Sequence, residues 1–108
     1  FPQVRAAINL KYDDIMERSL RSLGVKVLYT RSTPRTYRAS DDDVIRDIGR
    51  VVRDAREPPD AIVDPGGIGL EPITYVFGED AVDVALKALR LSDRYAEYLS
   101  SHRMSVLG

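Results

Sequence analysis

The chain has 108 residues, of which 44% are hydrophobic and 31% charged, and its formal net charge is -1. This length and composition predict one globular domain with a modest core, spanning residues 1–108. A nearly neutral chain has no overall field to hold a nucleic acid or an anionic membrane, and a chain without cysteine has no disulfides or cysteine zinc sites.

The first elements follow in a strand and helix order. Residues 6–10 form a short apolar run that predicts a buried strand. Either Asp13 or Asp14 can cap a helix that runs to Leu23, where Gly24 supplies the C-terminal stop. The apolar spacing within this segment places one face of the helix in the core.

A second strand, a loop and a second helix come next. Val25–Thr30 is rich in β-branched residues and predicts a strand, and the polar segment Arg31–Ala39 predicts a loop. Ser40 followed by Asp41–Asp43 is typical of a helix start, because a hydroxyl caps free amides and carboxylates favour the positive end of the helix dipole. The expected buried stripe of this helix consists of Val44, Ile48, Val51 and Val52.

Two short strands flank a glycine loop. Residues 57–59, Glu-Pro-Pro, end the second helix, and Ala61–Val63 and Ile73–Phe77 predict the strands. Between them lies the loop DPGGIGLEP, Asp64–Pro72, which holds three glycines and two prolines.

The last third of the chain predicts a long helix. Asp80 provides a cap, and the helical pattern continues to Leu99 inside a helical C-terminal tail, residues 92–108. The expected core face of this helix consists of Val82, Ala85, Leu86 and Leu89. The order of all these elements predicts an α/β fold, with a mixed or largely parallel sheet and flanking helices.

The glycine loop has two interpretations. Gly66, Gly67 and Gly69 can adopt positive φ and expose their amides, so the loop could wrap a phosphate. Alternatively, the loop is a tight reversal between neighbouring strands, and spacing alone favours this interpretation. It matches neither a Walker phosphate loop nor the dinucleotide fingerprint GxGxxG.

Other charged residues also allow a structural explanation. Asp41–Asp43 lack the spacing of metal ligands and are expected to cap the helix. Arg31, Arg35 and Arg38 either clamp an anionic ligand or form a solvated basic loop. His102, the one histidine, is expected to be solvated.

The N-terminal sequence and the hydropathy of the chain allow a prediction of where in the cell the protein lies. No apolar run approaches the roughly 20 residues of a membrane span, and the N-terminus lacks the pattern of a signal peptide. We therefore expect a cytoplasmic protein without a membrane partner. Phe1 is not an initiator methionine, so the chain is expected to be part of something longer.

Three stretches together resemble a known family. AAINLKY, GVKVLYT and PPDAIVDPGGIGLEPITYVFGEDAVDVALKAL, within Arg5–Leu91, are similar to the C-terminal part of the archaeal-type thiamine-phosphate synthase, or ThiN-like, domain. The resemblance implies an α/β domain whose ligand is thiamine phosphate. In the family, this domain is fused to a pyrimidine kinase or follows a helix-turn-helix segment in thiamine regulators.

The resemblance extends to individual positions. The positions that agree with the family pattern are Asn9, Tyr12, Asp64, Gly66, Gly67, Gly69, Glu71 and Pro72. Lys11 stands where arginine is usual, Pro65 replaces an arginine and Leu70 replaces a lysine. Two cations that could neutralise phosphate are therefore absent, and the family's upstream half, with basic and histidine positions, is not found in this sequence.

Three functional hypotheses follow. The first is a sensor of thiamine phosphate that reaches DNA only through a separate segment and uses no cofactor. In this hypothesis the amides of Gly66, Gly67 and Gly69 bind phosphate, Lys11 is the counter-charge, and Asn9 and Asp64 contact the heterocycle. The second is a Mg²⁺-dependent synthase that uses Lys11 and the arginine loop. The third is a homodimerisation domain that associates through Tyr95, Tyr98 and Leu99.

Overall fold

The computed structural model describes residues 1–107, with side chains described to residue 103. It contains a four-stranded sheet in the order β1-β6-β4-β2 and a two-stranded sheet of β3 and β5. The strands are β1 (Ala6–Lys11), β2 (Val27–Tyr29), β3 (Arg35–Arg38), β4 (Ala61–Asp64), β5 (Gly67–Ile68) and β6 (Ile73–Gly78). The helices are α1 (Asp14–Leu23), α2 (Asp41–Asp54) and α3 (Ala81–Leu107).

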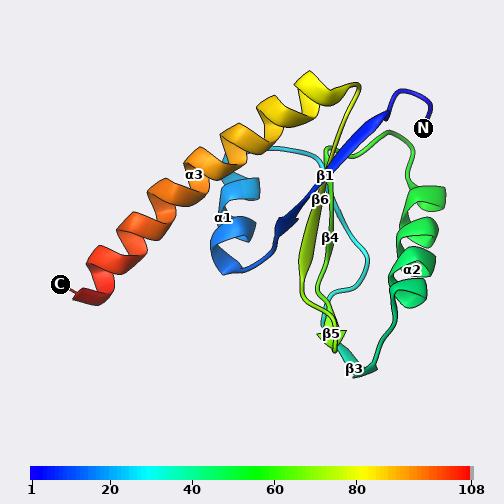
Figure 1. The fold of residues 1–108 in the computed structure, drawn as a ribbon, viewed down its shortest axis with the longest axis horizontal. Coiled ribbons are helices and arrows are strands. Elements are labelled where there is room, and N and C mark those ends of the chain that lie inside the picture. The colour runs from blue at the N-terminus through cyan, green and yellow to red at the C-terminus, as the bar shows by residue number, and fades with distance from the viewer. Residues whose placement is uncertain (108) are drawn as a thin grey trace.

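The predicted α/β class is confirmed, and the main sheet is mixed. β6 pairs antiparallel with both β1 and β4, whereas β2 and β4 are parallel. In Figure 1, α1 and α3 lie on one side of this sheet and α2 lies on the other. No helix within residues 1–107 combines the length and apolar character needed to cross a membrane.

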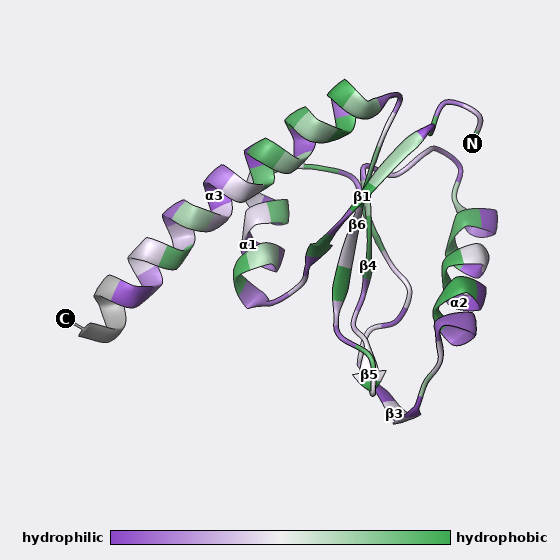
Figure 2. Cartoon of the chain, in the orientation of Figure 1, coloured by the Kyte–Doolittle hydropathy of each residue, from purple (hydrophilic) through white to green (hydrophobic). Residues whose placement is uncertain are grey.

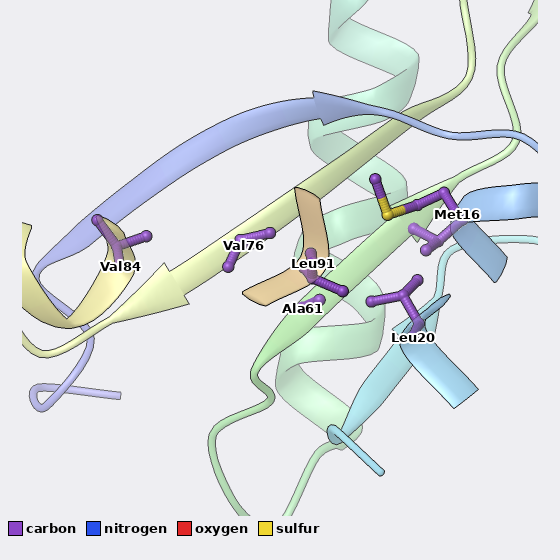
Figure 3. Close-up of a cluster of buried hydrophobic side chains, with 7 residues drawn as sticks. Met16, Leu20, Ala61, Val76, Val84 and Leu91 are labelled. Atoms are coloured by element: carbon purple, nitrogen blue, oxygen red, sulfur yellow. The ribbon is translucent and has the colours of Figure 1, made fainter. Parts of the chain in front are cut away.

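The main core lies between the sheet and the pair α1 and α3. It is formed by buried apolar side chains of α1, β4, β6 and α3 (Figure 3): Met16, Leu20, Ala61, Val63, Val76, Val84 and Leu91. Its two strands, β4 and β6, lie at the centre of the sheet, where a neighbouring strand on each side shields them from water. Burial of this apolar surface is the main favourable contribution to the stability of the fold.

The predicted starts of α1 and α2 and the predicted end of α1 are confirmed. Asp13 caps α1 by accepting a hydrogen bond from the amide of Met16 at 2.8 Å, and Gly24 ends it with φ of 65°. α2 begins with a capping box in which Ser40 and Asp43 each accept a hydrogen bond from the other's backbone amide. The acidic first turn of α2 therefore has a structural function.

The prediction of a buried first strand was wrong. β1 is an edge strand that pairs only with β6, and residues 7–9 are exposed. An apolar run does not distinguish a central strand from an edge strand whose outer side lacks a neighbour. The predicted loop Arg31–Ala39 was also partly wrong, because Arg35–Arg38 forms β3 and pairs with β5 inside the glycine loop.

The prediction for the buried face of α3 was wrong as well. Its buried residues are Val84, Ala88 and Leu91, whereas Val82, Leu86 and Leu89 are exposed. Apolar residues occupy both faces of this helix, so periodicity alone could not choose between them. Gly78 contributes to the choice: a Cβ there would lie 2.7 Å from the amide nitrogen of Val84, so the absence of a side chain lets the start of α3 pack directly on the end of β6.

The C-terminal part of α3 packs against α1. The hydroxyl of Tyr95 donates to Asp13 Oδ2 at 2.6 Å, and the Arg18 guanidinium lies 4.1 Å from the centre of the Tyr98 ring. Tyr95 and Leu99 are both half-buried. These contacts occupy much of the face that was expected to mediate self-association.

Candidate functional site

Three strands end at the same edge of the main sheet. β1 and β4 are each antiparallel to β6, and β2 is parallel to β4, so β1, β2 and β4 share one direction. Their carboxyl ends bring the regions of Lys11, Arg31 and Asp64 to one edge. Ligands of open α/β sheets commonly bind at such an edge.

The glycine loop begins at this edge and folds back tightly on itself. Gly66 and Gly69 have φ of 74° and 81°, conformations that favour glycine. At Gly66, a Cβ would lie 2.6 Å from the carbonyl oxygen of Leu70, so no side chain fits. Gly67 and Leu70 exchange two backbone hydrogen bonds of 3.1 Å, which close the turn.

The amides of the loop differ in their availability. The amide of Gly66 donates to Asp64 Oδ1 at 2.8 Å, and that of Gly67 donates to the carbonyl of Leu70. Among the described residues, the amide of Gly69 has no hydrogen-bond acceptor. In this structure, the part of the loop around Gly66 and Gly67 is a closed reversal, and the exposed amide is that of Gly69.

A buried ionic network of Arg35, Asp47 and Asp64 anchors the glycine loop to the fold. The Arg35 side chain is fully buried and donates through Nη1 to Asp64 Oδ1 and through Nη2 to Asp64 Oδ2, both at 2.8 Å. The same Nη2 donates to Asp47 Oδ2 of α2 at 2.8 Å, and Nη1 donates to the carbonyl of Gly66 at 3.0 Å. One side chain thus ties β3, β4, α2 and the loop together.

The charge of Asp64 is stabilised within this network. Burial alone would raise the pKa of Asp64, but hydrogen bonds from Arg35, Thr30 and the amide of Gly66 outweigh that effect and hold its pKa below the ordinary value. The hydrogen bonds to Asp64 raise the pKa of Arg35 more than burial lowers it, and the bond to Asp47 raises it as well. Asp64 and Arg35 therefore both stay ionised. The network therefore behaves as a fixed structural unit.

Sequence reasoning missed two members of this network. Thr30 donates to Asp64 at 2.7 Å from the end of β2, and Asp47 reaches Arg35 from α2. Asp47 lies one turn after Val44 on the buried side of the helix. A carboxylate within an apolar helix stripe is a signal that a buried cation pairs with it, and that signal was present in the sequence.

The other predicted site residues lie apart from the interior of the loop. Asn9 is exposed on β1, and Glu71 is exposed at the end of the loop. The Lys11 ammonium lies 4.7 Å from the centre of the Tyr95 ring and 3.9 Å from Asp13, so it is directed towards α1 and α3. Among the described residues, the acceptor for the Arg31 side chain is the carbonyl of Thr33, at 3.4 Å.

Arg38 lies beside the exposed end of the loop. A Cβ built on Gly69 would be 3.6 Å from both Cζ and Nη1 of Arg38, so the guanidinium lies beside Gly69. Arg38 is exposed, and it makes no ion pair with a described residue. A guanidinium and an amide donor in this arrangement can bind one anionic oxygen group.

A cavity of about 480 Å³ adjoins the other side of the loop, where Pro65 and Pro72 line it. In its wall, Glu17 accepts hydrogen bonds from the hydroxyls of Tyr12 and Tyr29 and from Arg21. Burial, followed by the bond to Glu17, raises the pKa of Tyr29 to about 12. The phenols therefore stay protonated and act as hydrogen-bond donors.

We next consider whether the described side chains could bind a divalent metal ion. Within residues 1–107, no group of three histidine, cysteine, aspartate or glutamate residues has metal-binding geometry. Asp43 caps α2, and Asp64 is bound to Arg35. The described residues therefore contain no preformed cluster of three metal ligands.

Comparison with known proteins matches this architecture to one family. The family model for thiamine-phosphate synthase ThiN matches residues 1–90. A thiamine-phosphate synthase ThiN from Methanothermobacter thermautotrophicus is 32% identical over 97 residues, which cover 87% of this chain and 51% of that protein.

Two solved structures share the fold. One is the C-terminal domain of a phosphomethylpyrimidine kinase, with a TM-score of 0.65 and 25% identity, and the match covers 83% of this chain and 53% of that one. The other is the C-terminal domain of protein MJ0236, with a TM-score of 0.66 and 27% identity over 90% of this chain and 52% of that one. This chain spans about half the length of these relatives. On the strength of the family match, the chain belongs to the family of thiamine-phosphate synthase ThiN.

Proposed function

We propose that this chain binds thiamine phosphate as a ligand-sensing domain and does not catalyse its synthesis. Membership of the ThiN family supports the choice of ligand. The observation that carries the sensing role is the position of the cations. Arg35, one of three arginines that could have replaced a lost phosphate contact, is fully buried in ion pairs with Asp47 and Asp64.

In this proposal, the phosphate of the ligand binds at the outer end of the glycine loop. The amide of Gly69 and the guanidinium of Arg38 supply its donors, because both are exposed and adjacent. Charge-assisted hydrogen bonds from arginine to phosphate are about twice as strong as neutral ones. Gly66, Gly67 and Asp64 contribute by fixing the shape of the loop rather than by touching the ligand.

Synthesis of thiamine phosphate requires more positive charge at the site than binding of thiamine phosphate does. The departure of diphosphate requires its developing negative charge to be balanced by positioned cations or a metal ion. Lys11 is directed towards Tyr95 and Asp13, and Arg35 is paired. The second candidate function, a synthase, is favoured by the 32% identity to a named synthase, although the chain covers 51% of that protein.

The ligand is tested by thermal unfolding with thiamine monophosphate, thiamine or inorganic phosphate. At a concentration of about 100 times its dissociation constant, a ligand adds about 2.7 kcal/mol of stability, which raises the Tm of a domain of this size by several degrees or more. We expect the shift with thiamine monophosphate alone, and Arg38→Gln should reduce it. Arg53→Gln, an exposed arginine on α2, is the matched control and should leave it unchanged.

The sensing role is tested by turnover. The chain is incubated with hydroxymethylpyrimidine diphosphate, thiazole phosphate and Mg²⁺, and thiamine monophosphate is measured. We expect no product. Product formation would replace the sensing role with the synthase, whereas the absence of any thermal shift would refute ligand binding itself. A sensor of this kind would act on DNA through a separate segment.

A further inference from the structure

The outward face of α3 carries an uncovered row of apolar side chains. Val82, Leu86 and Leu89 are 68%, 53% and 59% exposed, and Ala85 lies in the same row. These four residues, which we name the α3 stripe, follow the i, i+3, i+4, i+7 spacing of one helix face. The first turns of α3 are correspondingly green in Figure 2.

The α3 stripe has no partner within the described chain. Its helix is held in the fold by the opposite face, where Val84, Ala88 and Leu91 are buried. Single exposed apolar residues are common on protein surfaces, whereas a contiguous row of them marks an interaction surface. The stripe is therefore a site for another polypeptide.

The residues beside the α3 stripe indicate which polypeptide fits. One flank carries the small residues Ala81 and Ser92, which allow close approach of a second helix. The other flank carries Asp83 and Arg90, which lie two helical turns apart and have opposite charges. Among the described residues, Arg90 makes no ion pair, while Asp83 lies 3.6 Å from Lys87.

Two copies of this helix are complementary in an antiparallel arrangement. In a two-fold symmetric interface, residue i of one copy contacts residue j of the other and the reverse contact also occurs. When the stripes face each other, Val82 lies against Leu89 of the second copy, and Ala85 lies against Leu86. The same flank then meets itself in reverse order, so Arg90 of each copy faces Asp83 of the other.

We propose that the α3 stripe is the interface of a homodimer in which two copies of α3 pack antiparallel around a two-fold axis. The apolar row supplies the contact surface, and the Asp83 and Arg90 pair sets its direction. This surface replaces the face of Tyr95, Tyr98 and Leu99 that the sequence suggested, because contacts with α1 occupy much of that face. The proposal is independent of the ligand of the domain.

Analytical ultracentrifugation over a range of protein concentrations tests this proposal. The 12.1 kDa chain should sediment at twice that mass. Leu86→Asp should raise the dimer dissociation constant by about a hundredfold or more, since it places a charge in both halves of the contact. Ile45→Asp, an equally apolar residue of α2 that is 66% exposed, is the matched control and should leave the dimer intact.

A second variant tests the direction of packing. Arg90→Glu places like charges opposite each other in the antiparallel dimer and should weaken it by about tenfold, an effect that salt reduces. Circular dichroism should show that every variant keeps its helix content. A wild-type chain that remains monomeric at high concentration would overturn the proposal, as would equal effects of Leu86→Asp and Ile45→Asp.

Discussion

Two carboxylates of this domain have similar partners and very different surroundings. Asp64 accepts hydrogen bonds from the hydroxyl of Thr30, from Arg35 and from the amide of Gly66, and it is 2% exposed. Glu17 accepts from two tyrosine hydroxyls and from Arg21, and the side chains of Glu17 and Arg21 are 18% and 79% exposed. The difference teaches that burial, rather than the kind of partner, decides whether an ion pair is part of the framework.

The physical reason is the cost of leaving a charge without its partner. Water can solvate Glu17 and Arg21 when their contact breaks, so an exposed pair contributes little. Asp64 has no such alternative, because protein surrounds both it and Arg35. Asp47 is also buried, but it keeps a second ion pair, with Arg50 at 3.2 Å. The glycine loop is anchored by this buried network, and its outer end at Gly69 and Arg38 remains accessible to a ligand.

The largest expected effect comes from removal of the buried cation. Arg35→Met leaves the buried Asp64 without a counter-charge and leaves Asp47 paired only with Arg50. It should lower the free energy of unfolding by about 3–5 kcal/mol. Arg21→Met removes the exposed partner of Glu17 and should have no resolvable effect. Urea denaturation of both variants measures the difference, and equal losses would contradict the contrast between the two carboxylates.

The two ends of the glycine loop should differ in their tolerance of a side chain. Gly66→Ala combines positive φ with contact on the backbone of Leu70 and should cost about 3 kcal/mol or more. Gly69→Ala has similar φ, but its Cβ would make only ordinary van der Waals contact with the Arg38 side chain, so it should cost about 1 kcal/mol. The same denaturation experiment compares them, and a larger loss for Gly69→Ala would show that the outer end is the rigid one.

The smallest expected effect appears at acidic pH. The pKa of Asp64 in the folded protein is lower than its ordinary value of 3.8. Its contribution to stability is therefore complete above that ordinary value and is lost as the pH falls through the lower folded pKa. Thermal unfolding below pH 4 should be less pH-dependent in Asp64→Asn than in the wild type.

A matched variant completes this pH experiment. The pKa of Glu17 is also lowered: burial alone would raise it, but hydrogen bonds from Tyr29, Tyr12 and Arg21 outweigh that effect. Glu17→Gln should therefore change the acid dependence in the same direction, and by less than Asp64→Asn if its more exposed pair is the weaker one. An equal or larger change for Glu17→Gln would assign the acid sensitivity to the cavity instead of the loop.

The sequence by itself determined the features that depend on neighbouring residues. The caps at Asp13 and Ser40 and the stop at Gly24 were predicted because each acts through backbone groups within a few positions. The α/β class and the place of the glycine loop between two strands were also predicted, as was the resemblance to the ThiN family. Local hydrogen bonding and apolar periodicity are sufficient for these conclusions.

Only the tertiary structure decided which residues meet across the fold. Arg35 and Asp64 are 29 positions apart. The sequence offered Asp64 as a ligand contact and Arg35 as a possible anion contact, whereas the fold buries them against each other. The two apolar faces of α3 were equivalent by periodicity, and the packing of this helix on Gly78 and the sheet buried one of them. Such choices depend on the burial and shape of distant segments, for which a single sequence carries no local signal.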